Sequence, residues 1–417
     1  MTRVAASSSS SPSPPSSPSP SSVPPLDVFR ALLTEPGAGL LAGLRELTPA
    51  EELTTATRLR RDHPAEVVSA AIGQARLRQR AAAKFGSDAE RMYFTADGVE
   101  QATRAPVAAW RAERIAALGA RTVADLCCGI GGDAIALARA GLRVLAVDRD
   151  PLTCAVAEAN AAALGLADRV TVRQAAIGDL PDAELAGHDA VFLDPARRGG
   201  RGRTFDPEAY SPPLSEAVRI AGLAPLAALK VAPGLPHAAI PAEATEAEWV
   251  SHRGEVKEAV LWFGTNPDHP RRATVLPGPH TLVGAGPQAP TGPPGRYLLE
   301  PDGAVIRAHL VAELAETLNA RLLDPAIAYL TTDEPPPPTP FARAYEITDR
   351  LPFNVKRLRA LLRERDVGTV TIKKRGSAVT PEALRAKLRL AGAKSVTIIL
   401  TRVADTPTML LAQPVPA

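Results

Sequence analysis

The stretch that decides the fold is VADLCCGIGGDAIALARAGLRVLAVD, residues 123–148. A short run of β-forming residues leads into a glycine-rich turn, and the spacing that follows predicts a helix and then a second strand ending at Asp148. Gly129, Gly131 and Gly132 allow the turn to bend sharply and to approach a ligand closely, because no Cβ intervenes. The pattern predicts a nucleotide-type binding loop between a strand and a helix.

Two classes of ligand are compatible with this loop. Gly129, Gly131 and Ala134 fit the G-x-G-x-x-G/A spacing of dinucleotide-binding folds. Asp125, at the end of the first strand, instead favours S-adenosylmethionine, because its carboxylate can accept hydrogen bonds from the amino group of the methionine moiety. A pyrophosphate-binding turn has no use for that charge. Asp148 is placed to bind the ribose hydroxyls of either ligand. We expect S-adenosylmethionine as the cofactor, with a nicotinamide or flavin dinucleotide as the alternative.

Strands and helices continue to alternate after this stretch. The β-rich runs RVTVRQA, DAVFLDP and LAALKVAP are separated by segments with helical spacing. This alternation predicts an α/β fold with a Rossmann-like parallel sheet and helices on both faces. The runs WVSHRG, EAVLWFG and RRATVL follow without long helices between them, and we expect them to form antiparallel edge strands.

Four regions are expected along the chain. Residues 1–25 are almost wholly Ser and Pro after the first six positions, a composition typical of a disordered tail. Residues 26–118 have helical spacing and are predicted to form an N-terminal helical module. The sheet is expected in residues 119–334, followed by the stiff connector PPPPTP. Residues 341–417 are predicted to form a small basic α+β domain that contains a strand, a helix and a strand.

A second motif, DAVFLDPARRGGRGR, ends the fourth predicted strand with Asp194 and Pro195. The carboxyl ends of such strands bind substrates in open α/β sheets. In enzymes that methylate amines, an acidic side chain and the following Pro carbonyl accept hydrogen bonds from the amine and align its lone pair with the methyl group, so catalysis is mostly positioning. The simpler interpretation is that Asp-Pro only ends the strand.

Four arginines, at positions 197, 198, 201 and 203, follow this motif among glycines. A guanidinium loop beside a reaction centre suits a phosphate backbone, because Arg can bind phosphate oxygens in bidentate fashion. A solvated loop is the alternative interpretation.

The net charge of +3 hides an uneven distribution. Residues 341–417 hold 15 Lys and Arg against 6 Asp and Glu, a net charge of +9, whereas residues 116–340 hold 19 against 27, a net charge of −8. A basic module attached to an acidic one indicates an anionic partner such as nucleic acid, with a solvated surface as the alternative.

Composition also bears on location and on metals. No run of about 18 apolar residues is present and the first residues lack a secretory core, which predicts a cytoplasmic chain that does not span or bind a membrane. The three cysteines, Cys127, Cys128 and Cys154, do not recur at zinc-ligand spacing. We therefore expect neither a disulfide framework nor a metal site.

The glycine loop and the Asp-Pro motif together resemble a known family. VADLCCGIGGDAIALARAGLRVLAVDRDP and DAVFLDP are similar to the class I methyltransferase domain, most closely to its trimethylguanosine synthase-like branch. RMYFTADGVEQATR resembles the segment of that branch that folds over the cofactor, which makes Phe94, Thr95 and Gln101 candidate lid contacts. With the VTIKKRG unit, residues 60–415 resemble bacterial methyltransferases that carry a C-terminal THUMP-like domain.

The resemblance implies roles for individual residues. It puts Asp194 and Pro195 at the substrate amine, and it puts four residues on S-adenosylmethionine: Asp125, Gly129, Gly131 and Asp148.

The sequence departs from the family pattern at two places. Ala196 and Arg197 replace a second Pro and an aromatic residue that stacks on the base, so Arg197, Arg198 and Phe205 are the expected substrate contacts. A pair of alanines follows the third strand in place of a Gly-Asp-like adenine contact, and Asp179 is expected to take that role.

The resemblance also bears on the substrate. DPARR is similar to the DPPR segment of RNA uracil-C5 methyltransferases, but these need a downstream cysteine nucleophile and no cysteine follows Cys154. We therefore expect methyl transfer to an exocyclic amine of an RNA base, with N2 of guanine as a candidate. The alternatives are a non-catalytic, cofactor-binding RNA-binding protein and a methyltransferase that acts on a non-RNA amine.

THUMP-like modules are thought to contact structured RNA. Lys373, Lys374 and Arg375 are the expected phosphate contacts of the C-terminal domain. A domain kept only for packing or dimerisation is the rival interpretation, and the sequence does not predict an oligomeric state.

Overall fold

A computed structural model of the chain describes residues 25–196, 198–199, 202–203, 206–286 and 288–416. The chain divides into two compact units, one ending at Arg76 and the other beginning at Leu77. Helix α4, Ala65–Phe85, continues from the first unit into the second. None of the helices within the described ranges has both the length and the apolar composition needed to cross a membrane.

The first unit is helical. It contains α1 (Pro25–Leu32), α2 (Glu35–Ala42), α3 (Glu52–Leu59) and the beginning of α4. Thr34 caps α2 by accepting a hydrogen bond from the Gly37 N–H at 3.4 Å. Apolar side chains of these helices and of Leu44 form a small core: Leu32, Leu40, Leu44, Val68, Ala71, Ile72 and Ala75.

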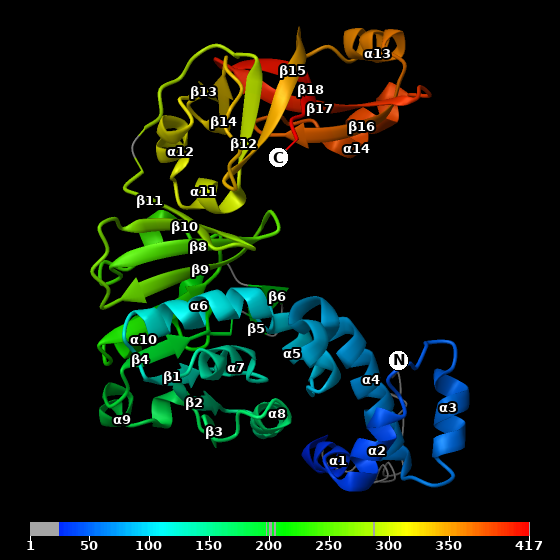
Figure 1. The fold of residues 1–417 in the computed structure, drawn as a ribbon, viewed down its shortest axis with the longest axis vertical. Helices are drawn as coiled ribbons and strands as arrows, with labels where there is room; N and C mark the ends of the chain where they lie inside the picture. Colours follow the sequence, from blue (N-terminus) through cyan, green and yellow to red (C-terminus); the bar gives the residue numbers. More distant parts are fainter. Residues whose placement is uncertain (1–24, 197, 200–201, 204–205, 287, 417) are drawn as a thin grey trace, which may run out of the picture. The chain divides into compact units, whose positions relative to one another are not determined.

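The second unit begins with the rest of α4, the short helix η1 (Gly86–Glu90), α5 (Ala96–Gln101) and α6 (Ala105–Ala117). Helix α6 lies along one face of the main sheet and buries Ala112 and Ile115 there (Figure 1). The predicted N-terminal module, residues 26–118, is therefore divided. Its periodicity correctly indicates helices with an apolar face, but that pattern does not specify which surface covers the face.

The main sheet has the strand order β11-β10-β8-β9-β7-β4-β1-β2-β3 (Figure 1). Its strands are β1 (Thr122–Leu126), β2 (Arg143–Asp148), β3 (Val170–Gln174), β4 (Ala190–Leu193), β7 (Leu226–Val231), β8 (Glu246–His252), β9 (Glu255–Phe263), β10 (Arg271–Leu276) and β11 (His280–Gly284). The pairs β1–β2, β2–β3, β1–β4 and β4–β7 are parallel. This arrangement confirms the predicted Rossmann-like sheet.

The three runs expected as antiparallel edge strands become β8, β9 and β10. Strand β9 is antiparallel to both of its neighbours, β7 and β8, whereas β8 and β10 pair in parallel. All three lie inside the sheet, and β11 forms the edge beside them. The edge prediction was wrong because absence of intervening helices indicates short connections and does not fix a strand's position in the sheet.

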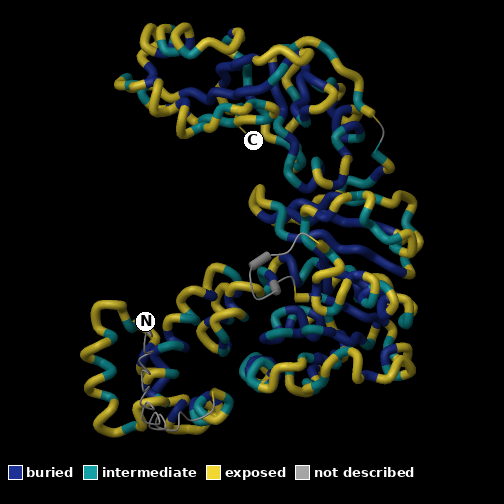
Figure 2. The backbone as a smooth tube through the Cα atoms, turned by 180° about the vertical axis from the view of Figure 1, so that it is seen from behind, coloured by how far each residue is buried: buried dark blue, intermediate teal, exposed yellow. Residues whose placement is uncertain are grey.

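Helices cover both faces of the main sheet, and its strands are largely buried (Figure 2). One face packs against α6, α7 (Gly132–Arg139) and α8 (Pro151–Ala163). The other packs against α9 (Asp182–Ala186), α10 (Leu214–Ala221), α11 (Gly303–Arg307) and α12 (Val311–Thr317). The connections include the hairpin β5 (Arg198–Gly199) and β6 (Gly202–Arg203), and the short helices η2 (Ile177–Asp179), η3 (Pro207–Ala209) and η4 (His237–Ala239).

The C-terminal part forms a second sheet with the order β13-β14-β12-β15-β18-β17-β16. Its strands are β12 (Tyr297–Pro301), β13 (Arg321–Asp324), β14 (Ile327–Thr332), β15 (Ala342–Pro352), β16 (Val367–Lys374), β17 (Lys394–Val403) and β18 (Thr406–Pro414). Helices α13 (Val355–Glu364) and α14 (Pro381–Leu388) pack on it. The predicted strand, helix and strand are β16, α14 and β17, and the two strands are parallel.

This sheet extends across the predicted boundary between residues 334 and 341. Strand β12, which precedes the proline connector, pairs with β15, which follows it. β14 then pairs with β12, and β13 with β14. The connector therefore joins two parts of one sheet.

Candidate functional site

The carboxyl ends of β1, β2 and β4 meet at one edge of the main sheet. Asp125 lies near the end of β1, Asp148 ends β2, and Asp194 directly follows β4. The Asp194 N–H donates to the carbonyl of Leu126 at 3.3 Å, and the Cys128 N–H donates to the carbonyl of Val147 at 3.0 Å. The fold thus brings together the acidic residues predicted for the cofactor and for the reaction centre.

The carboxylate of Asp148 holds the glycine loop at the end of β2 by a hydrogen bond. Gly129 and Gly131 have φ angles of +55° and +82°, which favour glycine, and Gly131 precedes the first residue of α7. The Gly129 N–H donates to Asp148 Oδ2 at 3.0 Å, and the Asp150 N–H donates to Asp148 Oδ1 at 3.0 Å. A Cβ on Gly131 would lie 3.3 Å from the Cβ of Ala157. The loop is therefore held close to both β2 and α8.

Asp125 is fully buried, and neither of its carboxylate oxygens has a hydrogen-bond partner among the described residues. Burial raises the pKa of Asp125 well above its usual value, and the charges of Asp133 and Asp194 raise it further. A buried carboxylate without a partner is costly. The ammonium of the methionine moiety of S-adenosylmethionine would supply the missing cation, so the donor set fits that ligand.

A segment before the main sheet is clamped onto the glycine loop by Asn160, a fully buried side chain of α8. Its amide nitrogen donates to the carbonyls of Tyr93 and Ile130 at 3.0 and 2.9 Å, and its oxygen accepts from the Tyr93 N–H at 2.6 Å. Gly98 of α5 packs so closely on Ile130 that a Cβ there would overlap its Cγ2 atom. The segment expected to fold over the cofactor is thus fixed to the loop.

The three candidate lid residues have different surroundings. Phe94 is buried with its ring centroid 5.5 Å from that of Phe85, and Thr95 caps α5 by accepting from the Gly98 N–H at 3.0 Å. Gln101, the last residue of α5, is exposed. Phe94 and Thr95 therefore hold the segment together, and their role as cofactor contacts stays a prediction.

Lys230 connects Asp194, at the predicted reaction centre, to the interior. Its Nζ atom lies 2.5 Å from Asp194 Oδ2 and 2.9 Å from the hydroxyl of Thr103. That hydroxyl donates to Asp133 Oδ2 at 2.9 Å, and Asp133 lies on α7, just after the glycine loop. The side chain of Lys230 is 5% exposed and that of Asp194 is 23% exposed, so the pair is shielded from solvent on the Lys230 side.

Arg111 of α6 continues this network. Its guanidinium pairs with Asp133 and with Glu258 of β9, both deeply buried, and stacks 4.3 Å from the ring centroid of Phe192. Side chains alternate between the faces of a strand, so the β strands present Asp125, Lys230 and Glu258 on the same face as their apolar neighbours under α6. Helix α6 is therefore anchored by charge as well as by apolar contact.

The chain beyond Asp194 is held in place through Ala196. The Ala196 N–H donates to the carbonyl of Ser211 at 2.9 Å, and the Ser211 N–H donates back at 3.0 Å. Pro195 is buried. Arg197 and Phe205 lie outside the described residues, as does the side chain of Arg198, so their predicted substrate contacts stay predictions.

Asp179, the predicted adenine contact, is exposed and lies in η2, which follows β3. Just after β3, the Ala175 N–H donates to the Asp148 carbonyl at 3.0 Å, which connects this segment to the end of β2.

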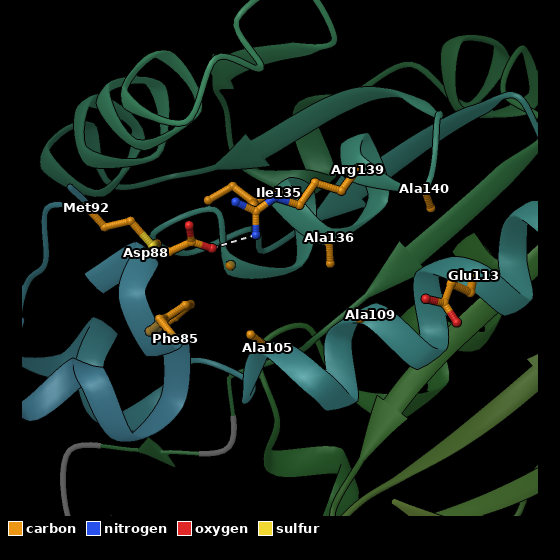
Figure 3. A pocket seen from close by; sticks show the side chains of 11 residues that line it. Phe85, Asp88, Met92, Ala105, Ala109, Glu113, Ile135, Ala136, Arg139 and Ala140 are labelled. Atoms are coloured by element: carbon orange, nitrogen blue, oxygen red, sulfur yellow. Dashed lines mark hydrogen bonds and ion pairs between the residues drawn. The ribbon is translucent and has the colours of Figure 1, made fainter. Parts of the chain in front are cut away.

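A pocket of about 210 Å³ lies away from these strand ends (Figure 3). Phe85, Met92, Ala105 and Ile135 are among its lining residues, and the ion pair between Asp88 and Arg139, at 2.6 Å, lies at its wall. None of the acidic residues at the ends of β1, β2 and β4 lines it. This pocket is therefore separate from the predicted reaction centre.

The predicted phosphate contacts of the C-terminal domain lie on the second sheet. Lys373 donates to Glu300 at 2.6 Å, and although burial acts against it, this partner raises the pKa of Lys373. The guanidinium of Arg375 lies 5.3 Å from the ring centroid of Tyr329, and Lys374 is exposed. Lys373 and Arg375 thus have intramolecular partners, whereas Lys374 faces solvent.

Sequence reasoning missed Lys230, Arg111 and Asn160. The sequence could have indicated that Lys230 has a buried partner, because it is the one charged residue in the otherwise apolar run LAALKV of β7. A charge in a strand that is buried on both faces requires a partner. Arg111 and Asn160 lie on helices, where a polar residue normally faces water, and nothing in their spacing marks them.

Comparison with known proteins bears on each part of the chain. Residues 120–203 match the sequence family described as RNA cap guanine-N2 methyltransferase, and residues 342–414 match the family described as THUMP domain-like. Residues 25–81 match a domain family of unknown function.

Relatives match over different lengths of the chain. A Mycobacterium tuberculosis protein described as an uncharacterised S-adenosylmethionine-dependent methyltransferase is 35% identical over 344 residues, which cover 78% of this chain and 90% of the relative. The 23S rRNA (uracil(1939)-C(5))-methyltransferase of Acidithiobacillus ferrooxidans is 39% identical over 83 residues, 18% of each chain. The crystal structure of a candidate methyltransferase from Porphyromonas gingivalis W83 has the same fold, with a TM-score of 0.74, 22% identity, and coverage of 94% of this chain and 98% of its own.

Proposed function

The chain belongs to the S-adenosylmethionine-dependent methyltransferases, and from that premise we propose that it methylates an exocyclic amine of an RNA base, with N2 of guanine as the target atom. The expectation of an enzyme that uses S-adenosylmethionine is confirmed, and the dinucleotide alternative for the glycine loop is set aside. The residue roles and the RNA substrate are parts of the proposal.

At the cofactor, the proposal assigns the buried carboxylate of Asp125 to the methionine ammonium. Gly129 and Gly131 let the loop backbone approach the ligand, and Asp148 binds the ribose hydroxyls while its oxygens also accept the N–H groups of the loop. Asp179 contacts the adenine. The unpartnered oxygens of Asp125 support this assignment, because a bound ammonium would supply the hydrogen-bond donors and the positive charge that the described residues do not provide.

At the reaction centre, Asp194 and the carbonyl of Pro195 accept hydrogen bonds from the target amine. When bound, S-adenosylmethionine would supply a sulfonium methyl group for transfer to the amine nitrogen, with the thioether as the leaving group. The Asp194 carboxylate would accept the proton that the amine loses. Lys230 occupies Oδ2 of that carboxylate, which leaves Oδ1 for the amine. The chain's contribution is therefore mainly the orientation of the amine.

RNA as the substrate is supported by similarity and by charge. The methyltransferase region is similar to a family described as acting on guanine N2 of the RNA cap, and a shorter region is similar to an rRNA methyltransferase. Residues 341–417 carry a net charge of +9 and match a THUMP domain-like family. The observation that carries the proposal is the position of Asp194 beside the glycine loop, since its N–H bonds to Leu126 of the same strand that carries Asp125.

The test is methyl transfer to RNA from labelled S-adenosylmethionine, followed by digestion to nucleosides and mass spectrometry. We compare the full chain with Asp194→Ala and with Asp168→Ala, an exposed acidic residue that serves as a matched control. Cofactor affinity is measured for each protein by titration calorimetry.

We expect labelled N2-methylguanosine with the wild type and with Asp168→Ala, and a loss of labelling of at least about a hundredfold with Asp194→Ala at unchanged cofactor affinity. Cofactor binding with no labelling of any RNA would overturn the RNA proposal and favour another amine substrate or a non-catalytic role. Labelling that survives Asp194→Ala would overturn the role of Asp194.

A further inference from the structure

A second pocket, of about 610 Å³, lies at the beginning of α6. It is lined by three segments: the carboxyl end of α4, the amino end of α6, and the turn between β8 and β9. All three segments belong to the unit that begins at Leu77. Its lining residues are Ala82, Ala83, Lys84, Phe85, Gly86, Arg104, Ala105, Pro106, His252, Arg253, Glu255 and Lys257.

The lining of this pocket is strongly cationic. Lys84, Arg104, Arg253 and Lys257 carry positive charges, and Glu255, which pairs with Lys257, is the acidic residue among the lining side chains. The turn that supplies Arg253 and Lys257 belongs to residues 116–340, a range of the sequence with a net charge of −8. A local excess of positive charge in an acidic region is the pattern expected of a site for an anion.

The cations act on one another inside the pocket. Burial, together with the charges of Arg104 and Lys230, lowers the pKa of Lys84 to about 8. Lys84 is held in this position by hydrogen bonds to the carbonyls of Glu100 and Ala102 at 2.7 and 2.8 Å. The fold thus keeps together charges that repel each other, and an anion would relieve that repulsion.

The amino end of α6 adds to the positive potential. Arg104, which directly precedes this 13-residue helix, lines the pocket together with the first two helical residues, Ala105 and Pro106. The helix has no acidic residue in its first turn and no side chain that caps its N–H groups. The positive end of a helix dipole attracts anions. The helix dipole and the cationic side chains therefore both make the potential in the pocket more positive.

The pocket adjoins the reaction centre through one residue. Thr103, which directly precedes Arg104, accepts the hydrogen bond of Lys230, and Lys230 holds Asp194. On the opposite side, the turn that carries Arg253 lies against the C-terminal sheet, since a Cβ on Gly254 would meet the guanidinium of Arg343 at 3.2 Å. The pocket thus lies between a turn that contacts the C-terminal sheet and a chain of buried side chains, Thr103 and Lys230, that ends at Asp194.

We propose that this pocket binds the phosphate backbone of RNA next to the nucleotide that is methylated, an inference that rests on the proposed RNA methyltransferase function. Two arginines suit this ligand, because the guanidinium binds phosphate oxygens in bidentate fashion. Phosphate contacts of this kind fix the register of the substrate and leave the choice of base to the reaction centre.

The test is fluorescence anisotropy of a labelled single-stranded RNA with the full chain, measured over a range of salt concentrations. Arg253→Glu reverses an exposed charge for which the described residues provide no side-chain partner, and Arg104→Gln removes a second charge. Glu255→Gln removes the acidic residue of the pocket. The matched control is Arg143→Glu, an exposed arginine at the opposite, amino-terminal edge of the sheet.

We expect the combination of Arg253→Glu and Arg104→Gln to weaken RNA binding at least tenfold. The slope of log K against log salt should become shallower by about 0.7 for each phosphate that the variant no longer neutralises. Glu255→Gln is expected to strengthen binding, which a purely structural role would not produce. Arg143→Glu should bind like the wild type. Binding of S-adenosylmethionine should be unchanged in all of these variants.

The outcomes separate this inference from the proposed function. RNA that binds equally well to Arg253→Glu, Glu255→Gln and the wild type would overturn the pocket assignment, even if the enzyme methylates RNA. Pocket-dependent RNA binding without methyl transfer would overturn the proposed function and support the pocket. Displacement of RNA by polyglutamate at equal charge concentration would overturn the assignment in favour of an acidic protein partner.

Discussion

The ammonium of Lys230 lies 2.5 Å from Oδ2 of Asp194, and both side chains lie on the face of the main sheet that packs under α6. This ion pair fixes one oxygen of the proposed catalytic carboxylate while the other remains for the substrate. It also connects the reaction centre to Thr103, and through it to Asp133 of α7. Lys230 is therefore a positioning residue in the proposed mechanism.

Lys230→Met is expected to lower kcat by about 10–100-fold, equivalent to about 1.4–2.7 kcal/mol, because Asp194 loses the cation that orients it. The Kd for S-adenosylmethionine should stay unchanged. The measurement is steady-state methyl transfer, with Lys356→Met, an exposed lysine of α13, as the control. The double variant Lys230→Met/Asp194→Asn should regain stability without regaining activity. Equal losses of cofactor affinity and kcat would contradict a role in positioning.

Asp125→Asn is expected to weaken cofactor binding and yet stabilise the cofactor-free protein. The folded state raises the pKa of Asp125, so the protonated form is favoured in the fold, and this contribution to stability is lost as pH rises through the folded-state pKa. Replacement by a neutral amide removes that penalty, so the melting temperature should rise at pH 7.5 and rise less at pH 5. Thermal shift with and without S-adenosylmethionine measures both effects.

The matched control for Asp125 is Asp168→Asn, which changes an exposed carboxylate. Loss of a charge-assisted hydrogen bond corresponds to about 1.5–3 kcal/mol, or roughly 10–100-fold in Kd. A cofactor-free Asp125→Asn protein that melts below the wild type at pH 7.5 would show that this carboxylate has a structural partner.

Much of this site follows from the sequence, and the reasons for the rest are physical. The glycine loop, Asp125, Asp148 and Asp194 could be predicted because strand ends and turn residues leave local patterns. The partners of these residues could not, since Arg111 meets Glu258 across 147 positions of the chain. Long-range pairing of this kind has no local signature. Only Lys230, a charge in an apolar strand, indicated a buried partner.

The fold, like the site, could be predicted from the sequence only where local patterns specify it. Alternation of strands and helices predicts the parallel sheet, but it does not reveal that β12 joins the C-terminal sheet, because a strand's partner depends on which edge is free. The proline connector was a reasonable boundary by composition. Composition reports local stiffness and carries no information on hydrogen bonding across it.

Gly98→Ala is expected to weaken binding of S-adenosylmethionine, because the new Cβ overlaps Ile130 and displaces α5 from the glycine loop. Alanine normally favours a helix over glycine by about 0.5–1 kcal/mol, so a loss of function here would reflect the close contact. Calorimetric titration measures the effect. Ile130→Ala in the same protein should restore part of the affinity, since the new Cβ still lies 2.8 Å from the Thr95 hydroxyl. Gly73→Ala in α4, where a Cβ meets nothing within 4 Å, should leave affinity unchanged.

RNA binding is expected to weaken as pH rises from 7 to 9, since burial and nearby cations lower the pKa of Lys84 to about 8. The groups that act on it are Arg104, Lys230 and Lys257, which disfavour its charge, and Glu100, which favours it. Lys84→Arg should bind RNA with little change over this range, because arginine stays protonated. Anisotropy across pH measures the effect. A wild-type protein without this pH dependence would show that Lys84 does not contact the RNA.

The contribution of Lys84 to stability depends on pH in the opposite sense to its contribution to RNA binding. The folded-state pKa of Lys84 lies below that of an unfolded lysine, so the unfolded chain holds more protons between the two values. The contribution of Lys84 to stability should therefore increase as pH rises through about 8 toward the pKa of a free lysine. Urea unfolding of the wild type and Lys84→Arg at pH 7 and 9 would reveal it.

The pairing of β12 with β15 has a consequence for how the protein is made and dissected. During synthesis β12, β13 and β14 leave the ribosome before the other strands of their sheet. The edge of β12 that pairs with β15 therefore stays unpaired until the residues after the prolines have been made. A fragment that begins after the connector would leave the edge of β15 that β12 covers, residues 342–346, without its partner, and unpaired edges promote aggregation. Expression of the C-terminal domain alone should therefore start before Tyr297, and gene fusions made at the prolines would separate two halves of one sheet.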